Sequence, residues 1–210
     1  MEKKVFEDDF LLKLNKNFER QSQYFDFEFY VLSELGTSIF EINKCLILEF
    51  YRASITLTNN VLERLLKLAL IYNEVGIEPK PLDNWNEIFV EPNKKYGTIQ
   101  LGNSIELCKK LGLLTAEEKT FLFDTIRELM RNGFSHYDTS KILENIPEET
   151  TFFSGSFSNP TELSEVKMNQ KVIPIFQSLQ VENFAKQNAL FYFDYVFKLI
   201  KSIEERLKSK

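Results

Sequence analysis

The chain has 210 residues, 43% of them hydrophobic and 27% charged, and a formal net charge of −5; this composition predicts one globular domain spanning residues 1–210. The acidic balance argues against an extended basic surface for duplex nucleic acid, but it leaves room for a local grip on a phosphate. No segment is apolar enough for a signal peptide or a membrane span, so we expect a cytoplasmic protein with no membrane partner.

The first half of the chain predicts two helices. Few chain breakers, 7 glycines and 6 prolines against 20 phenylalanines, indicate long elements that pack through large apolar side chains. Residues 15–35 read as an aromatic-rich helix that ends near Gly36. Residues 45–75 read as one long central helix of roughly eight turns, stopped by Gly76. Its apolar face repeats at helical steps through Ile47, Tyr51, Ile55, Leu62, Leu66 and Ala69.

The middle of the chain predicts a loop and two shorter helices. Residues 77–102 contain several prolines and glycines and read as a loop with a short turn around Trp85. Residues 103–111 read as a short helix closed by Gly112. Thr115 and Glu118 have the spacing of a capping box, which predicts a helix from there to Gly133.

The last third is less regular. Residues 140–181 read as an insertion of unknown role, in which residues 150–157 and 171–176 have strand-like composition and could pair. Residues 184–207 read as the final helix, with an apolar stripe and basic residues near its end. We therefore expect an all-α bundle with a long central helix and an irregular, partly β insertion before the last helix.

The chemistry of the chain is expected around its one histidine, His136, which follows Arg131 and Asn132. Arginine offers a planar, permanently charged fork for phosphate oxygens, and histidine exchanges protons near neutral pH. If Gly133 lets the chain leave the helix, both side chains can turn toward a common point. Because the ribose 2′-hydroxyl serves as the nucleophile, such a pair can cleave RNA without a metal or cofactor.

Arg131-Asn132-x-x-x-His136 resembles the signature of the HEPN superfamily, in which Arg and a polar residue precede His by four to six positions. The helical context, with a long helix before the motif, is similar too. The resemblance implies an endoribonuclease of toxin or phage-defence type that leaves a 2′,3′-cyclic phosphate and a 5′-hydroxyl. It also implies a homodimer with a composite active site, and an antitoxin or defence-system partner. The alternative is a non-catalytic HEPN-like module that binds a nucleotide, an RNA or a protein.

Four further residues are candidates for supporting this site. Asn132 either orients Arg131 or the His136 ring, contacts a phosphate, or caps the helix. Ser135 is expected to cap the next helix rather than act in chemistry, and Tyr137 to pack. Asp138 either stabilises protonated His136 or caps a helix. Some HEPN toxins carry Tyr two residues after the His; Asp138 stands there, which argues against tyrosine modification by an antitoxin.

A purely structural interpretation of the motif competes with a functional site: the histidine could be a satisfied interior side chain, with the arginine only capping a helix.

The two cysteines do not indicate a further site. Cys45 and Cys108 are too few for a disulfide framework and lack partners for a zinc site, so we expect two buried free thiols and no metal.

Overall fold

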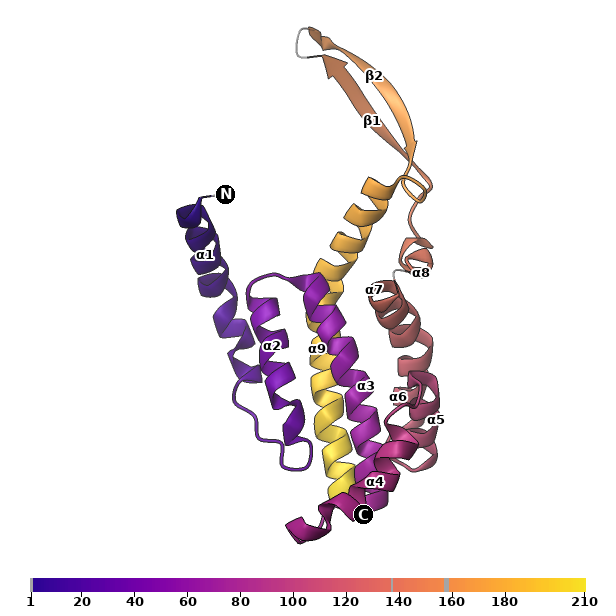
Figure 1. Cartoon of the computed structure of the whole chain (residues 1–210). Coiled ribbons are helices and arrows are strands. Elements are labelled where there is room, and N and C mark those ends of the chain that lie inside the picture. Colours follow the sequence, from indigo (N-terminus) through magenta and orange to yellow (C-terminus); the bar gives the residue numbers. More distant parts are fainter. Residues whose placement is uncertain (1, 137, 157–158) are drawn as a thin grey trace.

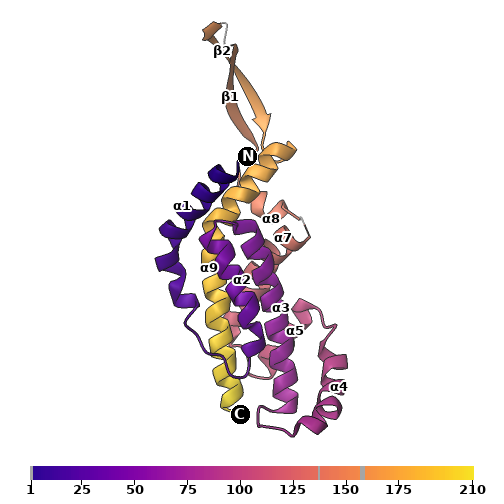
Figure 2. The same ribbon diagram turned by 60° about the vertical axis from the view of Figure 1, so that its left-hand side comes forward.

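The computed structural model describes residues 2–136, 138–156 and 159–210, and shows an elongated helical body from which one β-hairpin projects (Figure 1). Two long helices form its axis, α3 (Tyr51–Val75) and α9 (Pro174–Lys208). They lie side by side in both views (Figures 1 and 2). Between Pro174, at its first position, and Lys208, α9 contains no glycine or proline, so its 35 residues run uninterrupted for about 52 Å.

The remaining helices cover the two sides of this axis. One side carries α1 (Lys3–Gln21) and α2 (Gly36–Ile47), with the short 3₁₀ turns Ser22–Tyr24 and Ser33–Leu35 between them. The other side carries α4 (Trp85–Tyr96, after the 3₁₀ turn Leu82–Asn84), α5 (Leu101–Lys110), α6 (Ala116–Phe121), the π-helical segment η4 (Leu122–Asn132), α7 (Gly133–Ser135) and α8 (Ser140–Leu143). The core between them is aliphatic along α3 and aromatic where Tyr24, Phe27 and Phe29 pack against Phe197.

The β-hairpin extends from the N-terminal end of α9, away from the bundle (Figure 1). Its strands, β1 (Glu149–Ser156) and β2 (Asn159–Asn169), are antiparallel, with Phe152 opposite Val166. The Phe152 ring stacks on Phe176 of α9, 4.8 Å between centroids. The all-α class is confirmed, and the strand expected at residues 150–157 is confirmed as far as residue 156, since residue 157 lies outside the described residues. The expected partner strand at 171–176 is wrong, because the chain there forms the turn into α9.

The expected helix at residues 45–75 is two helices. The chain turns at residues 48–50, where Glu49 has a φ of 62° and its carboxylate accepts from Lys16 and Asn17 of α1. The apolar steps continue across this turn from Ile47 to Tyr51, so the periodicity showed which face is buried but not the reversal of direction. Gly76, with a φ of 80°, ends α3 as expected.

Other boundaries differ as well. The first helix covers Lys3–Gln21 rather than residues 15–35, and Gly36 begins a helix instead of ending one. Residues 77–102 are not a loop, since α4 forms there with Pro92 inside it and packs Phe89 against Tyr72. The final helix begins ten residues earlier than expected, at Pro174 instead of residue 184.

Several local expectations are confirmed. The helix at 103–111 corresponds to α5, and Gly112 follows it with a φ of 71°. Thr115 and Glu118 form the capping box. Both cysteines are free, and Cys108 is buried as expected, but the expectation of two buried thiols is wrong for Cys45, which is only half-buried. Of the described residues, none belongs to a helix with the length and hydropathy needed to cross a bilayer.

Candidate functional site

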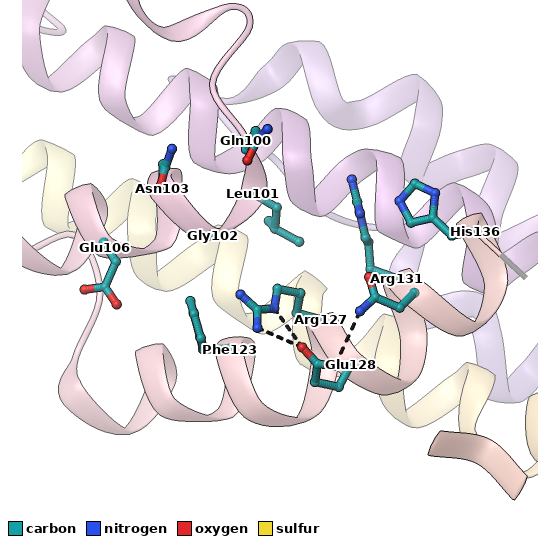
Figure 3. A pocket seen from close by; sticks show the side chains of 11 residues that line it. Gln100, Leu101, Gly102, Asn103, Glu106, Phe123, Arg127, Glu128, Arg131 and His136 are labelled. Atoms are coloured by element: carbon teal, nitrogen blue, oxygen red, sulfur yellow. Dashed lines mark hydrogen bonds and ion pairs between the residues drawn. The ribbon is translucent and has the colours of Figure 1, made fainter. Parts of the chain in front are cut away.

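Arg131, Asn132 and His136 line one open pocket between η4 and the start of α5 (Figure 3). Its volume is about 590 Å³, within the range of small-molecule sites. From η4 and the turn after it come Phe123, Arg127, Glu128, Arg131, Asn132 and His136. From the facing side come Gln100, Leu101, Gly102, Asn103 and Glu106. The pair that the sequence singled out therefore shares one cavity.

The π-helical winding of η4 determines which side chains reach this pocket. A π-helix closes its hydrogen bonds between residues five apart, so its faces repeat at four and five positions instead of three and four. The lining residues follow that rule: Phe123 and Glu128 are five apart, and so are Arg127 and Asn132. On the opposite side Leu122, Ile126 and Met130 are buried. π-turns are rare and concentrate at functional sites.

Gly133 does not end the helix, contrary to the expectation. It is buried with helical angles, φ −63° and ψ −38°, and the chain leaves the helix only at His136. A Cβ added at Gly133 would lie 2.7 Å from Cδ1 of Ile142. The glycine is therefore needed for the close approach of α8, not for a special backbone conformation.

His136 follows the last turn of α7 and is exposed. Its backbone N–H donates to the carbonyl oxygen of Asn132 at 3.2 Å. The interpretation as a satisfied interior histidine is thus wrong, because His136 is exposed and lines the pocket. Figure 3 shows its ring on the side of the pocket toward which the Arg131 side chain extends.

Arg131 is held by a carboxylate that the sequence analysis missed. Its Nε donates to Oε1 of Glu63 on α3 at 3.2 Å, and both side chains are about one-third exposed. Within the described part of the chain, no hydrogen bond is found for its two terminal amino groups. Asn59 and Glu63 are polar residues four apart on α3, and that interruption of an apolar helix was the available sequence signal.

Asn59 ties the two ends of the motif to the bundle. Its Nδ2 donates to the Met130 carbonyl oxygen and to Ser135 Oγ, each at 3.1 Å. Its Oδ1 accepts from the Tyr192 hydroxyl of α9 at 2.8 Å. Asn59 is 2% and Tyr192 0% exposed, so the bonds to the Met130 carbonyl and from the Tyr192 hydroxyl are protected from water. The network fixes the residues on either side of the segment from Arg131 to Phe134.

Ser135 has a different role from that expected, whereas the contacts of Asp138 fit one of its two predicted roles. Ser135 accepts from Asn59 and does not cap the next helix. Asp138 lies just before that helix, whose N-cap is Thr139, and its Oδ1 accepts from the Ser140 hydroxyl at 2.6 Å and the Ser140 N–H at 3.2 Å. These hydrogen bonds lower the pKa of the Asp138 carboxyl, and Asp138 does not line the pocket. Of its two readings, the geometry fits the helix cap. Tyr137 lies outside the described residues.

Glu128 connects two other polar side chains of the pocket. Its Oε1 accepts from Nε and Nη2 of Arg127, at 3.0 and 2.8 Å. Its Oε2 accepts from the Asn132 amide at 3.4 Å, so Asn132 orients toward this carboxylate. The Arg127 guanidinium also lies 3.8 Å over the centre of the Phe123 ring. The lining contains two arginines and two glutamates, Glu106 and Glu128, whose charges balance, and Glu63 adds one negative charge beside Arg131.

Comparison with known proteins finds no match for this chain, whether among family models, curated proteins or solved structures. The likeness to HEPN proteins consequently rests on the Arg131-Asn132-x-x-x-His136 motif and its helical setting. What the fold adds is the placement of both residues in one pocket.

Proposed function

We propose that the chain is a metal-independent endoribonuclease of the HEPN type, acting in a toxin or phage-defence setting. The observation that carries the proposal is the shared pocket, which is faced by an exposed histidine and by a half-buried arginine whose terminal amino groups bond to none of the described residues. This pairing supplies a phosphate clamp and a proton acceptor without a metal or cofactor.

The reaction uses the substrate's own nucleophile. Neutral His136 takes the proton of a ribose 2′-hydroxyl, and the 2′-oxygen attacks the adjacent phosphorus. Arg131 donates from its terminal amino groups to the non-bridging oxygens, where negative charge grows in the transition state. The bond to the 5′-oxygen breaks, that oxygen takes a proton from solvent, and His136 returns its own proton to solvent. The products are a 2′,3′-cyclic phosphate and a 5′-hydroxyl.

Glu63 both positions and restrains Arg131. Its bond to Nε fixes the plane of the guanidinium, which leaves the outer edge for a phosphate. Its negative charge also opposes phosphate binding at short range. We therefore expect modest affinity for a single phosphate, so that contacts along a longer RNA must supply much of the binding. In a composite dimer, a second His136 would replace solvent as the acid.

The test is cleavage of total RNA and of a tRNA pool in EDTA. Wild type is compared with His136→Ala, Arg131→Ala and the control Arg64→Ala, an exposed arginine of α3 paired with Glu34 outside the pocket. The proposal expects cleavage by wild type and Arg64→Ala, lost in both site variants. Equal cleavage by all four proteins would refute the site. No cleavage by folded wild type, with RNA or nucleotide binding retained, would favour the non-catalytic module.

A further inference from the structure

The N-terminal helix α1 leaves many of its large apolar side chains exposed to solvent. It packs against α2 and the turn that follows it, and in Figure 1 its N-terminal half extends beyond the end of α2. Of its described residues only Gln21 is buried. The large apolar side chains that remain exposed are Val5 at 54%, Phe6 at 52%, Phe10 at 39%, Leu11 at 52%, Leu12 at 67% and Phe18 at 45%. At 100° per residue, Phe6, Phe10, Leu11 and Phe18 lie on one side of the helix, and Val5 and Leu12 lie on the other. An exposed apolar stripe such as the first marks an interaction site.

The exposed side chains border a groove. Phe10, Leu14 and Phe18 of α1 are spaced four apart and form one wall. Phe40 and Ile47 of α2 belong to the other wall, and the groove has a volume of about 680 Å³. Phe6 continues the α1 stripe by one turn, past the part that α2 covers. Each molecule thus carries an apolar groove beside a projecting aromatic residue.

Charge along α1 indicates what fills this groove. The first half of α1 is net negative, since Glu7, Asp8 and Asp9 outnumber Lys3 and Lys4, and the second half is net positive, since Lys13, Lys16 and Arg20 outnumber Glu19. Within one molecule Lys3 pairs with Glu7, Lys13 with Asp9 and Lys16 with Glu49, so the contact with a second copy adds to these exposed pairs. A second α1 running antiparallel would bring each acidic half beside a basic half. A parallel copy would place like charges together. The helix is therefore complementary to itself about a two-fold axis, as an isologous contact requires.

We propose that two copies of this chain dimerise through α1, with the helices antiparallel and Phe6 of each copy seated in the groove of the other. The face carrying α1 lies across α3 and α9 from the pocket helices α5 and α7 (Figure 1). This dimer leaves each Arg131/His136 pocket open on an outer side. It is distinct from the composite dimer that the HEPN resemblance implies, and it does not depend on ribonuclease activity.

Sedimentation of the full chain at about 1–100 µM, a range that covers ordinary dimer affinities, tests the proposal. Wild type should be a dimer. Phe6→Asp and Leu11→Asp should each raise the dissociation constant by roughly 100-fold, because a two-fold interface contains every substitution twice. Both residues are exposed, so the variants should keep the wild-type circular dichroism. Leu12→Asp is the control: the side chain of residue 12 points about 160° away from those of residues 10 and 14, so this substitution should leave the dimer intact.

Mixing charge variants tests the antiparallel pairing. Glu7→Lys/Asp9→Lys and Lys13→Glu/Lys16→Glu should each self-associate more weakly than wild type, and an equimolar mixture should form a heterodimer. A wild type that remains monomeric over the whole range would overturn the proposal. A dimer whose dissociation constant is unchanged by Phe6→Asp and Leu11→Asp would also overturn the proposal, because the contact would then lie elsewhere, such as on the face that carries the pocket.

Discussion

Replacing Asn59 by alanine should loosen the motif from inside the bundle. The substitution removes the two donors that hold the Met130 carbonyl and the Ser135 hydroxyl, and the acceptor of the Tyr192 hydroxyl. Met130 keeps a bond from the Gly133 N–H, and exposed Ser135 can turn to water. The Tyr192 hydroxyl cannot, since it is fully buried. The cost is therefore dominated by one orphaned hydroxyl and a small cavity.

The expected magnitude follows from those losses. An unsatisfied buried hydroxyl costs about 1–3 kcal/mol, and the small cavity adds roughly 1 kcal/mol. Asn59→Ala should thus lower the free energy of unfolding by about 2–4 kcal/mol, or the melting temperature by roughly 5–15 °C. Tyr192→Phe removes the hydroxyl itself and should cost less, about 1–2 kcal/mol. The double variant should cost less than the sum of the two.

Thermal unfolding followed by circular dichroism measures these values, with Asn60→Ala as the control because Asn60 is exposed on the same helix. At a temperature where Asn59→Ala is still folded, RNA cleavage should fall at least about tenfold, because Arg131 and His136 lose their fixed spacing. A melting temperature within about 1 °C of wild type would refute the role assigned to this network. Strict additivity with Tyr192→Phe would refute the bond between them.

Three further results are expected. Glu63→Gln should lower the KM for RNA about 2- to 10-fold, because it removes the charge beside Arg131 while keeping an acceptor; an unchanged KM in steady-state cleavage would contradict this. Gly133→Ala should lower the free energy of unfolding in urea by about 1–3 kcal/mol, because the added Cβ would lie 2.7 Å from a side chain of α8. Gly36→Ala is the control, since no neighbouring atom lies within 4 Å of its added Cβ, and it should be neutral or stabilising by about 0.5–1 kcal/mol. Burial opposes ionisation of the Glu204 carboxyl, but hydrogen bonds from a lysine and two backbone N–H groups outweigh burial and hold its pKa low. The stabilisation that ionised Glu204 gives to the fold is present above about pH 4.3 and is lost as pH falls through the folded pKa. Glu204→Gln should therefore lower the free energy of unfolding at neutral pH and make it depend less on pH in acid.

Sequence patterns succeeded where local chemistry decides the structure. Thr115 and Glu118 satisfy backbone groups of their own helix, and Gly76 and Gly112 adopt left-handed angles that other residues resist. These features depend on a few neighbouring residues, so spacing alone identifies them. Arg131 and His136 do line one pocket, but the expected route was wrong, since Gly133 stays helical and the chain leaves the helix only at His136.

Features that depend on distant residues were missed. Glu63 reaches Arg131 across 68 positions, and no local pattern connects them. The turn at Glu49 is stabilised by side chains of α1. A glycine is required at position 133 because α8 packs too closely for a larger residue. The π-helical winding of η4 has no spacing rule of its own in the sequence, because its buried positions at steps of four also suit an α-helix.

The chemistry of the products tests the central claim most directly. An RNA oligonucleotide that the protein cleaves is compared, in EDTA, with the same oligonucleotide carrying one 2′-deoxyribose at the cleavage position, and the products are identified by mass. The account predicts a 2′,3′-cyclic phosphate and a 5′-hydroxyl from the first and no cut at that position in the second, with both reactions absent in His136→Ala. Cleavage of the deoxy-substituted strand, a 5′-phosphate product, or full activity in His136→Ala would contradict a metal-independent ribonuclease site formed by Arg131 and His136.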